Sequence, residues 1–283
     1  MMPWSRQGVL DLNRRGRMER AGVDPDGWLE HFIWEPQVGS TNDHARQWLE
    51  THPQVGGPLL VVADRQTAGR GRGDHRWWSP EGCLMASVGW NHPPAPSRPE
   101  YRSQWGLIVG LAAAEAIHPV VRQGVGLKWP NDLYLQGRKV AGILVESQGR
   151  GDLVIGIGIN VSVDFANAPE EVRQRAVSLQ PYLSQPTDRS QLLERFLRSL
   201  ARTIHQWQTD PDFLFQSWQN YCLLRGKKVR VEELHRTTEG RCLGIDPEGR
   251  LVVQPDWGEP ISVLSGTILP MEPLDRVAHP GIL

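Results

Sequence analysis

The sequence predicts an α+β fold, in which a mixed β-sheet packs with helices and a small SH3-like β-barrel follows. Three observations support this. Apolar, β-branched runs alternate with helical patterns as far as about residue 223, and residues 188–208 repeat apolar residues at three- and four-residue spacing. Beyond Leu224 the pattern changes to short strands separated by turn signals. At 283 residues the chain is long for one average domain, so we expect a large domain and a small one.

The elements of the larger domain follow in order along the chain. The segment 29–38 predicts a strand, and Ser40 then begins a helix, with Asp43 three residues later as in a capping box. Further strands are predicted at 58–66, 83–90 and 152–163, and a helix that backs the sheet at 101–120. In the last strand, Gly156 and Gly158 would let a ligand or a partner backbone come near.

Two helices and a set of short strands complete the predicted fold. Residues 188–208 form an amphipathic core helix, and a shorter helix follows at 212–222. Turn signals at 239–240, 246–249 and 256–258 then indicate the small barrel. We therefore predict an arm at 1–27, a catalytic domain at 28–223, an SH3-like domain at 224–270 and a tail at 271–283.

Composition excludes several classes of protein. A formal charge of −1 and a pI near 6.8 give no overall attraction to nucleic acid or to anionic membranes. The three cysteines are scattered and the nine histidines show no close pairing, so neither a disulfide framework nor a metal site is predicted. No segment approaches about 18 consecutive apolar residues, and the N-terminus lacks a signal-peptide core. We expect a cytoplasmic protein.

The most informative segment is KWPNDLYLQGRKVAGILVE, residues 128–146. Pro130 fixes its own φ, and Asn131 and Asp132 can hydrogen-bond nearby backbone, which predicts a rigid corner. Lys139 stands at the entrance to the following strand, where Gly142 leaves room for a close approach. An ordinary hairpin with a solvated lysine explains the same residues equally well, so a second motif has to decide.

That motif is ADRQTAGRGRGDHRWWS, residues 63–79, in which glycines alternate with Arg70 and Arg72. Glycines allow several backbone N–H groups to turn toward one point, and guanidinium groups add charge and forked donors. The pattern predicts a site for phosphate or a phosphoanhydride. A flexible basic loop, or an arginine-glycine segment that binds RNA, is the alternative. Segments of the second kind usually come as long repeats, and this run is short and single.

With both motifs present, the chain resembles the catalytic domain of biotin–protein ligases, which attach biotin to a carrier lysine of biotin-dependent carboxylases. Four blocks occur in the family's order: Ser40-Thr41-Asn42, Gln66 with the glycine-arginine loop and Trp77, KWPND with Lys139 to Gly142, and Gly156 to Val161. The resemblance implies a fold like that of class II aminoacyl-tRNA synthetases and biotin ligases. It also implies ATP and Mg²⁺ as cofactors and a biotin carboxyl carrier protein as partner.

The resemblance further assigns roles to particular residues. The catalytic group would be Lys139, Arg70, Arg72 and Asp132, with Lys139 bridging the biotin carboxylate and the α-phosphate and Asp132 helping with a metal or the incoming amine. The biotin-binding residues would be Ser40, Thr41, Asn42, Gln66, Gly69, Arg70, Gly71, Trp77, Lys139 and Gly142. The nucleotide-binding residues would be Arg72, Trp77, Asn131, Lys139 and Asn160. Residues 164–187, where relatives complete the adenine pocket, show no pattern that can be aligned.

Several alternatives remain open at this point. A lipoate or octanoate ligase or transferase belongs to the same superfamily, and a noncatalytic RNA-binding module belongs to a different class. Some family members carry a DNA-binding winged helix, but the arm at 1–27 is too short for one, so no DNA partner is expected. An exposed strand edge that receives the carrier could equally pair with itself, which leaves a homodimer open.

Overall fold

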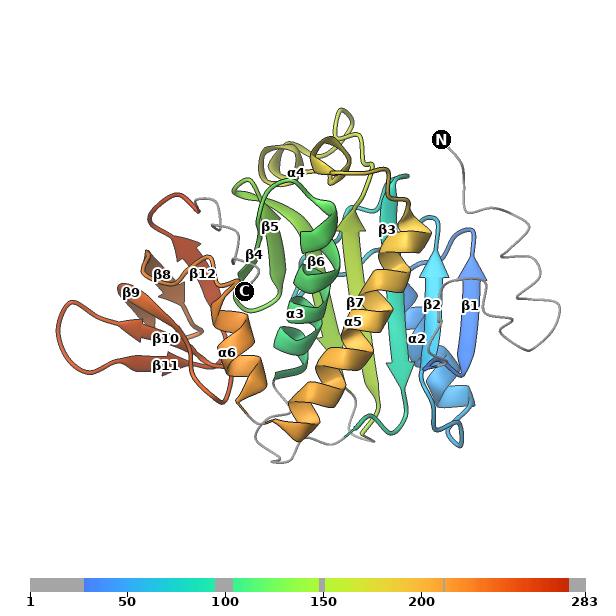
Figure 1. Cartoon of the computed structure of the whole chain (residues 1–283), viewed down its shortest axis with the longest axis horizontal. Coiled ribbons are helices and arrows are strands. Elements are labelled where there is room, and N and C mark those ends of the chain that lie inside the picture. The colour runs from blue at the N-terminus through green and yellow to red at the C-terminus, as the bar shows by residue number, and fades with distance from the viewer. Residues whose placement is uncertain (1–27, 95–103, 148–150, 211, 275–283) are drawn as a thin grey trace.

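The computed structural model describes residues 28–94, 104–147, 151–210 and 212–274, so the predicted arm at 1–27 lies outside it. The larger part is a seven-stranded sheet in the order β1-β2-β3-β7-β6-β5-β4 (Figure 1). The β1–β2 pair is parallel and the others are antiparallel, which confirms a mixed sheet. The strands are β1 His31–Glu35, β2 Leu59–Ala63, β3 Cys83–Trp90, β4 Val125–Lys128, β5 Asp132–Leu135, β6 Arg138–Glu146 and β7 Leu153–Asn160.

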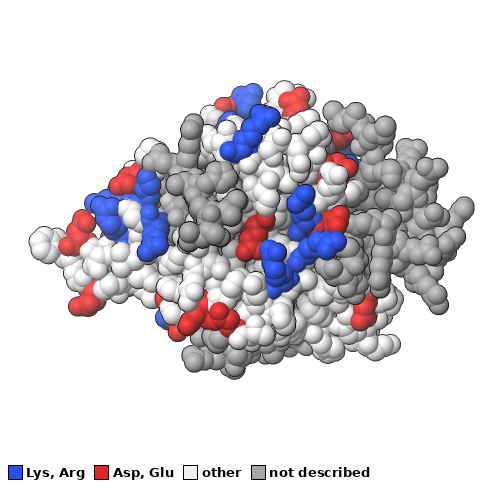
Figure 2. All heavy atoms as spheres, in the orientation of Figure 1, with Lys and Arg blue, Asp and Glu red and all other residues white. Residues whose placement is uncertain are grey.

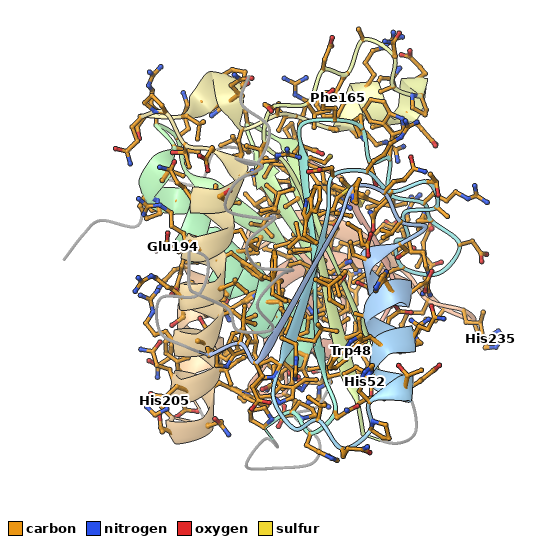
Figure 3. The ribbon with its side chains drawn as sticks, turned by 90° about the vertical axis from the view of Figure 1, so that its right-hand side faces the viewer. Trp48, His52, Phe165, Glu194, His205 and His235 are labelled. Atoms are coloured by element: carbon orange, nitrogen blue, oxygen red, sulfur yellow. The ribbon has the colours of Figure 1, made fainter. Side chains whose placement is uncertain are left out.

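Helices cover both faces of this sheet. Figures 1 and 3 show α3 (Trp105–Ile117) and α5 (Arg189–Thr209) on one face and α2 (Thr41–Thr51) on the other. Nearly every residue of α3 is buried, because this apolar helix is enclosed between the sheet and α5. The short α6 (Phe213–Gln219) packs beside α3, and a short α4 (Glu170–Arg175) follows the sheet.

The helix starts differ from the prediction in their capping. Asp188 accepts from the backbone N–H of Gln191, whose side chain accepts in return, so α5 begins with a capping box. Ser40 is the N-cap of α2 but makes no side-chain cap hydrogen bond, and the capping-box pattern expected at Ser40 and Asp43 is wrong. The side chain of Asp43 instead forms ion pairs with Arg46 and Arg70.

The C-terminal part is a five-stranded antiparallel sheet in the order β11-β10-β9-β8-β12. Its strands are β8 Lys228–Glu232, β9 Thr237–Ile245, β10 Leu251–Gln254, β11 Ile261–Val263 and β12 Thr267–Pro270. Buried and exposed residues alternate along most of β9, as expected for a sheet with one covered face. Within the described residues β11 and β12 are the two edges, so the SH3-like closure stays a prediction, as do the domain boundaries.

The turn between β9 and β10 joins the two sheets. Trp129 donates from its indole Nε1 to the carbonyl of Gly249 (3.0 Å), and Gln104 donates to the carbonyl of Pro247 (2.7 Å). Gly249 has φ +84°, and an added Cβ would lie 2.7 Å from Leu107 Cδ1, so the close approach needs glycine. The C-terminal sheet therefore contacts the residue that precedes Pro130 directly.

The surface over α5 carries mixed charge. Figure 2 shows basic and acidic side chains interspersed on this face, over α5 and the C-terminal sheet. Ion pairs such as Arg198–Glu194 and Arg202–Glu115 account for part of this pattern. No field of one sign covers this face, in line with the formal charge of −1. Among the described helices, none has the length and apolar character needed to cross a membrane.

Candidate functional site

The KWPND corner is the tip of the hairpin between β4 and β5. Its Trp129–Pro130 peptide bond is cis, and Trp129 is buried. Asn131 makes two hydrogen bonds to Ile143 of β6. Its side chain donates to the Ile143 carbonyl (2.7 Å), and its own carbonyl accepts from the Ile143 N–H (3.0 Å). The segment is therefore both a hairpin and a rigid corner, because its tip is hydrogen-bonded to β6.

Lys139 lies beside this corner at the start of β6. Its Nζ is 2.6 Å from Asp132 Oδ1 and 5.6 Å from the centre of the Trp77 ring. The carboxylate and the aromatic face therefore both contact the lysine side chain, the first as an ion pair and the second through a cation–π contact. The backbone of Lys139 is also fixed, because its carbonyl accepts from the N–H of Val177 (2.9 Å) and from the amide of Asn160 (3.4 Å). Four separate segments of the chain therefore hold this lysine in place.

Residues 164–187, which had no recognisable pattern, contribute to this wall of the site. Val177 bonds to Lys139, and the N–H of Leu179 donates to the Asn160 carbonyl (2.8 Å). Asn160 is buried, and its Oδ1 lies 3.5 Å from Cys83 Sγ. Burial raises the pKa of Cys83 to about 12, against a smaller opposing effect of Arg189, so this thiol stays protonated at neutral pH.

The glycine-arginine loop folds back on itself. The N–H of Gly71 donates to the His75 carbonyl (2.8 Å), and the N–H of Trp77 donates to the Gly69 carbonyl (3.0 Å). An added Cβ at Gly69 would lie 2.5 Å from the Trp77 carbonyl, so this glycine permits a close turn. Because Gly71 and Trp77 use their N–H groups within the loop, these two amides are not part of an anion cradle here.

The two arginines of the loop have different surroundings. Arg70 forms ion pairs with Asp43 (2.6 Å) and Glu146 (2.7 Å). Burial lowers its pKa, but the hydrogen bonds and charges of the two carboxylates outweigh this and raise the pKa above its usual value. Arg72 has no ion pair within the part of the chain that the structure describes, and it borders the site cavity.

A polar network occupies the start of α2. The N–H of Thr41 donates to Gln66 Oε1 (2.7 Å), and the Gln66 amide donates to the Ser79 hydroxyl (3.0 Å). The Ser87 hydroxyl lies 2.7 Å from both Thr41 Oγ1 and Asn42 Oδ1, and Asn42 donates onward to the carboxylate of Glu146. Ser40, Thr41 and Asn42 are all buried. The predicted biotin-recognition residues are therefore pre-organised by one another.

The glycines of β6 and β7 form the floor of the site. An added Cβ at Gly142 would lie 3.0 Å from Trp77 Cζ3, and one at Gly158 would lie 2.5 Å from Trp77 Cε2. At Gly156 the added atom would lie 2.1 Å from Asn42 Oδ1. The groups that approach these glycines are thus side chains of the protein itself, namely Trp77, Asn42 and, at Gly142, Lys139. The indole N–H of Trp77 is buried and has no hydrogen-bond partner among the described residues.

These elements enclose a cavity of about 60 Å³ that brings most of the predicted site residues together. It is lined by Ser40, Thr41, Asn42, Gln66, Arg70, Gly71, Arg72, Trp77, Asn131, Lys139, Gly142, Ile143, Leu144, Gly156, Ile157 and Gly158. Of the predicted residues, Gly69, Asp132 and Asn160 lie behind this lining rather than in it. A second hollow of about 400 Å³ adjoins it, and both are lined by Arg72, Asn131 and Ile143.

Two carboxylates at the site carried no signal in the sequence motifs. Glu146 ends β6 and contacts Arg70, Arg46 and Asn42. Asp43 was expected only as a helix-capping residue. No group of three or more metal-binding side chains occurs within the described residues, and Asp132 is the one carboxylate beside Lys139 there.

Comparison with known proteins gives the same picture along most of the chain. Residues 34–164 match the model of the Biotin/lipoate A/B protein ligase family, and residues 225–269 match that of the Biotin protein ligase C terminal domain. The biotin–acetyl-CoA-carboxylase ligase of Mycobacterium tuberculosis is 33% identical over 251 residues, which are 86% of this chain and 90% of that protein. The bifunctional ligase/repressor BirA of Bacillus subtilis is 30% identical over 266 residues, 89% of this chain and 79% of the relative.

Solved structures extend this likeness to the fold. The biotin protein ligase from Aquifex aeolicus in complex with biotin and ATP superposes with a TM-score of 0.72 at 29% identity, covering 85% of this chain and 98% of that one. The ligase from Leishmania major in complex with biotinyl-5-AMP has a TM-score of 0.56 at 26% identity, with coverage of 82% and 97%.

Proposed function

Because this chain belongs to the biotin protein ligase family, we propose that it joins biotin to ATP as biotinoyl-5′-AMP and then transfers the biotinoyl group to a lysine of a biotin carboxyl carrier protein. The observation that carries the proposal is the meeting of Lys139, Trp77 and the glycine floor in one cavity. A relative with the same fold binds biotin and ATP. The enzyme is thus an AMP-forming biotin–carrier protein ligase.

In the first step a carboxylate oxygen of biotin attacks the α-phosphorus of ATP, and the bond to pyrophosphate breaks. Both reactants are anions, so the site has to offset their repulsion and the charge that develops on phosphorus. Lys139 is the group for this role, because Asp132 and the Trp77 face hold its ammonium at the cavity. A compact cation held there stabilises the transition state more than either separate reactant.

In the second step the amine of the acceptor lysine attacks the acyl carbon of the mixed anhydride, and AMP leaves. The amine must be neutral to attack, and Asp132 is the carboxylate that pairs with Lys139 among the described residues. We assign Asp132 to position that amine. Trp77 covers the glycine floor and excludes water from the anhydride, which otherwise hydrolyses.

The nucleotide would lie where Arg72 and Asn131 border both hollows. Asn160 lines neither hollow and contacts the Lys139 carbonyl instead. Mg²⁺ usually binds through one or two carboxylates together with substrate phosphates and water. Asp132 fits that pattern, since it is a single carboxylate beside Lys139 and is not part of a protein cage of metal ligands within the described residues. A bound Mg²⁺ would neutralise phosphate charge.

The test is biotin-dependent exchange of labelled pyrophosphate into ATP, run with lipoate and octanoate as competitors. We expect exchange that requires biotin and is not inhibited by either competing acid. Exchange that depends on lipoate or octanoate would instead favour the alternative ligase, and salt-sensitive RNA binding without any exchange would favour the RNA-binding module. The absence of a DNA partner stays a prediction, because residues 1–27 lie outside the described part of the chain.

A further inference from the structure

Four charged side chains from three separate segments form an ionic cluster at the rim of the site. Asp43 and Arg46 come from the first turns of α2, Arg70 from the glycine-arginine loop, and Glu146 from the end of β6. We call these four residues the rim cluster. None of the sequence motifs predicts it, because the members are up to 103 positions apart and meet only in the folded chain.

The contacts within the rim cluster are close and directional. Arg70 approaches Glu146 with both terminal nitrogens, Nη2 to Oε1 at 2.7 Å and Nη1 to Oε2 at 3.2 Å, and Nη1 also reaches Asp43 Oδ1 at 2.6 Å. This forked arrangement uses the planar shape of guanidinium and carboxylate. The Glu146 side chain is only 20% exposed, so solvent screens these contacts less than it would at an open surface.

Glu146 also links the loop to the residues expected to recognise biotin. Its Oε2 accepts from Arg46 (2.8 Å) and from the amide of Asn42 (2.9 Å). Asn42 in turn is bonded to Ser87, which lies within hydrogen-bond distance of Thr41. One carboxylate therefore fixes the glycine-arginine loop and the start of α2 to the same strand end.

The surroundings of the two loop arginines indicate different roles. The guanidinium of Arg70 is already shared between two carboxylates, whereas Arg72 faces the junction of the two hollows without an ion pair among the described residues. If Arg70 also had to hold a substrate anion, it would first have to leave both carboxylates. An anchoring role needs no such rearrangement.

We propose that Glu146 and Asp43 are positioning residues, which hold Arg70 so that it anchors the glycine-arginine loop over the site while Arg72 is the arginine that meets the substrate phosphates. The identity of the substrate rests on the function proposed above. Pockets for small ligands typically measure about 300 to 1,000 Å³. The cavity measures about 60 Å³, so the loop that carries Trp77 has to shift when biotin enters. The rim cluster then determines how long the closed loop retains biotinoyl-AMP.

The experiment uses Glu146→Gln, Asp43→Asn, Arg70→Gln and the double variant Arg70→Gln/Glu146→Gln in the full chain. The first readout is the rate at which preformed, labelled biotinoyl-AMP leaves the enzyme. We expect biotinoyl-AMP to leave Glu146→Gln and Arg70→Gln about tenfold faster than it leaves the unchanged enzyme. It should leave Asp43→Asn about threefold faster. The double variant should be no faster than either single change, because both break the same anchor.

A matched control is Glu194→Gln, which removes a carboxylate from an arginine pair on α5. Figure 3 shows Glu194 on α5, across the sheet from α2. This variant should release the intermediate at the rate of the unchanged enzyme. Because Asp43 is half exposed, Asp43→Asn also provides a variant that should fold normally even if Glu146→Gln does not.

The second readout needs no ligand. Amide hydrogen exchange in residues 69–77 of the ligand-free protein should accelerate in Glu146→Gln and in Arg70→Gln to the same extent. This measurement tests the anchor even if the chain makes no biotinoyl-AMP, an outcome that would count against the proposed function alone. Unchanged exchange and unchanged release in both Glu146→Gln and Asp43→Asn, or fully multiplicative effects in the double variant, would overturn the proposal.

Discussion

The two faces of the seven-stranded sheet are built from the same strands but packed in opposite ways. On the α3 and α5 face, isoleucines such as Ile155 and Ile159 enter one continuous apolar core. On the α2 face, the alternate positions Gly142, Gly156 and Gly158 carry no side chain, and Trp77 and Asn42 lie over them. Because side chains alternate across a strand, the run VIGIGIN supplies a core on one side and a floor for the site on the other. Residues on one face of this strand thus stabilise the fold, and the glycines on the other face form the floor of the site.

The largest expected effect lies on the site face. Replacing Lys139 by Ala removes the cation that offsets the charge of two reacting anions. We expect biotin-dependent pyrophosphate exchange to fall by about 10²- to 10³-fold, while thermal unfolding and circular dichroism stay close to those of the unchanged protein. Normal exchange in this variant would remove Lys139 from the mechanism.

A smaller effect is expected at the floor. Gly158→Ala places a methyl group 2.5 Å from the Trp77 ring, so the indole has to move away from the sheet. The KM for biotin should rise by about tenfold, as expected for about 1.4 kcal/mol of lost binding, with little change in the melting temperature. A KM equal to that of the unchanged enzyme would show that Trp77 does not need this position to form the site.

The smallest effect is expected on the core face of the same strand. Ile155→Val removes one methylene from a side chain that is 1% exposed. It should lower the free energy of unfolding by about 0.5 to 1.5 kcal/mol in urea denaturation. The KM for biotin and the exchange rate should stay unchanged. Altered kinetics in this variant would mean that the core face and the site face of the strand are coupled, which would contradict the comparison.

Local patterns were sufficient to predict most elements. The strand at 83–90 and the helices at 101–120 and 188–208 are confirmed within a few residues wherever they are described, because each depends on its own apolar periodicity. The hairpin strands β4 and β5 were predicted only as an alternative and without bounds, since four-residue strands carry too little periodicity to be recognised. Ser40 is the N-cap of α2 as expected, but the capping box with Asp43 is wrong, because Asp43 pairs with Arg46 and Arg70 instead.

The predicted site residues stay predictions as to their roles. Their convergence in one cavity follows from strand order, since β6 and β7 bring Lys139, Gly142 and Gly158 beneath the loop that carries Trp77. Residues 164–187 showed no pattern, yet they bond to the backbone of Lys139 and Asn160. Contacts of this kind depend on the tertiary path of the chain, which cannot be predicted from the spacing of neighbouring residues.

The sequence alone predicted which residues could do chemistry here: a lysine at a rigid corner, a loop of glycine and arginine, and a strand with glycine at the alternate positions 156 and 158. These depend on backbone freedom and local hydrogen bonding, which act over a few residues. The tertiary structure decided the partners of those residues. Arg70 contacts Asp43 and Glu146 and Arg72 does not, although both belong to one short motif, because ion pairs form between charges that the fold brings within about 4 Å.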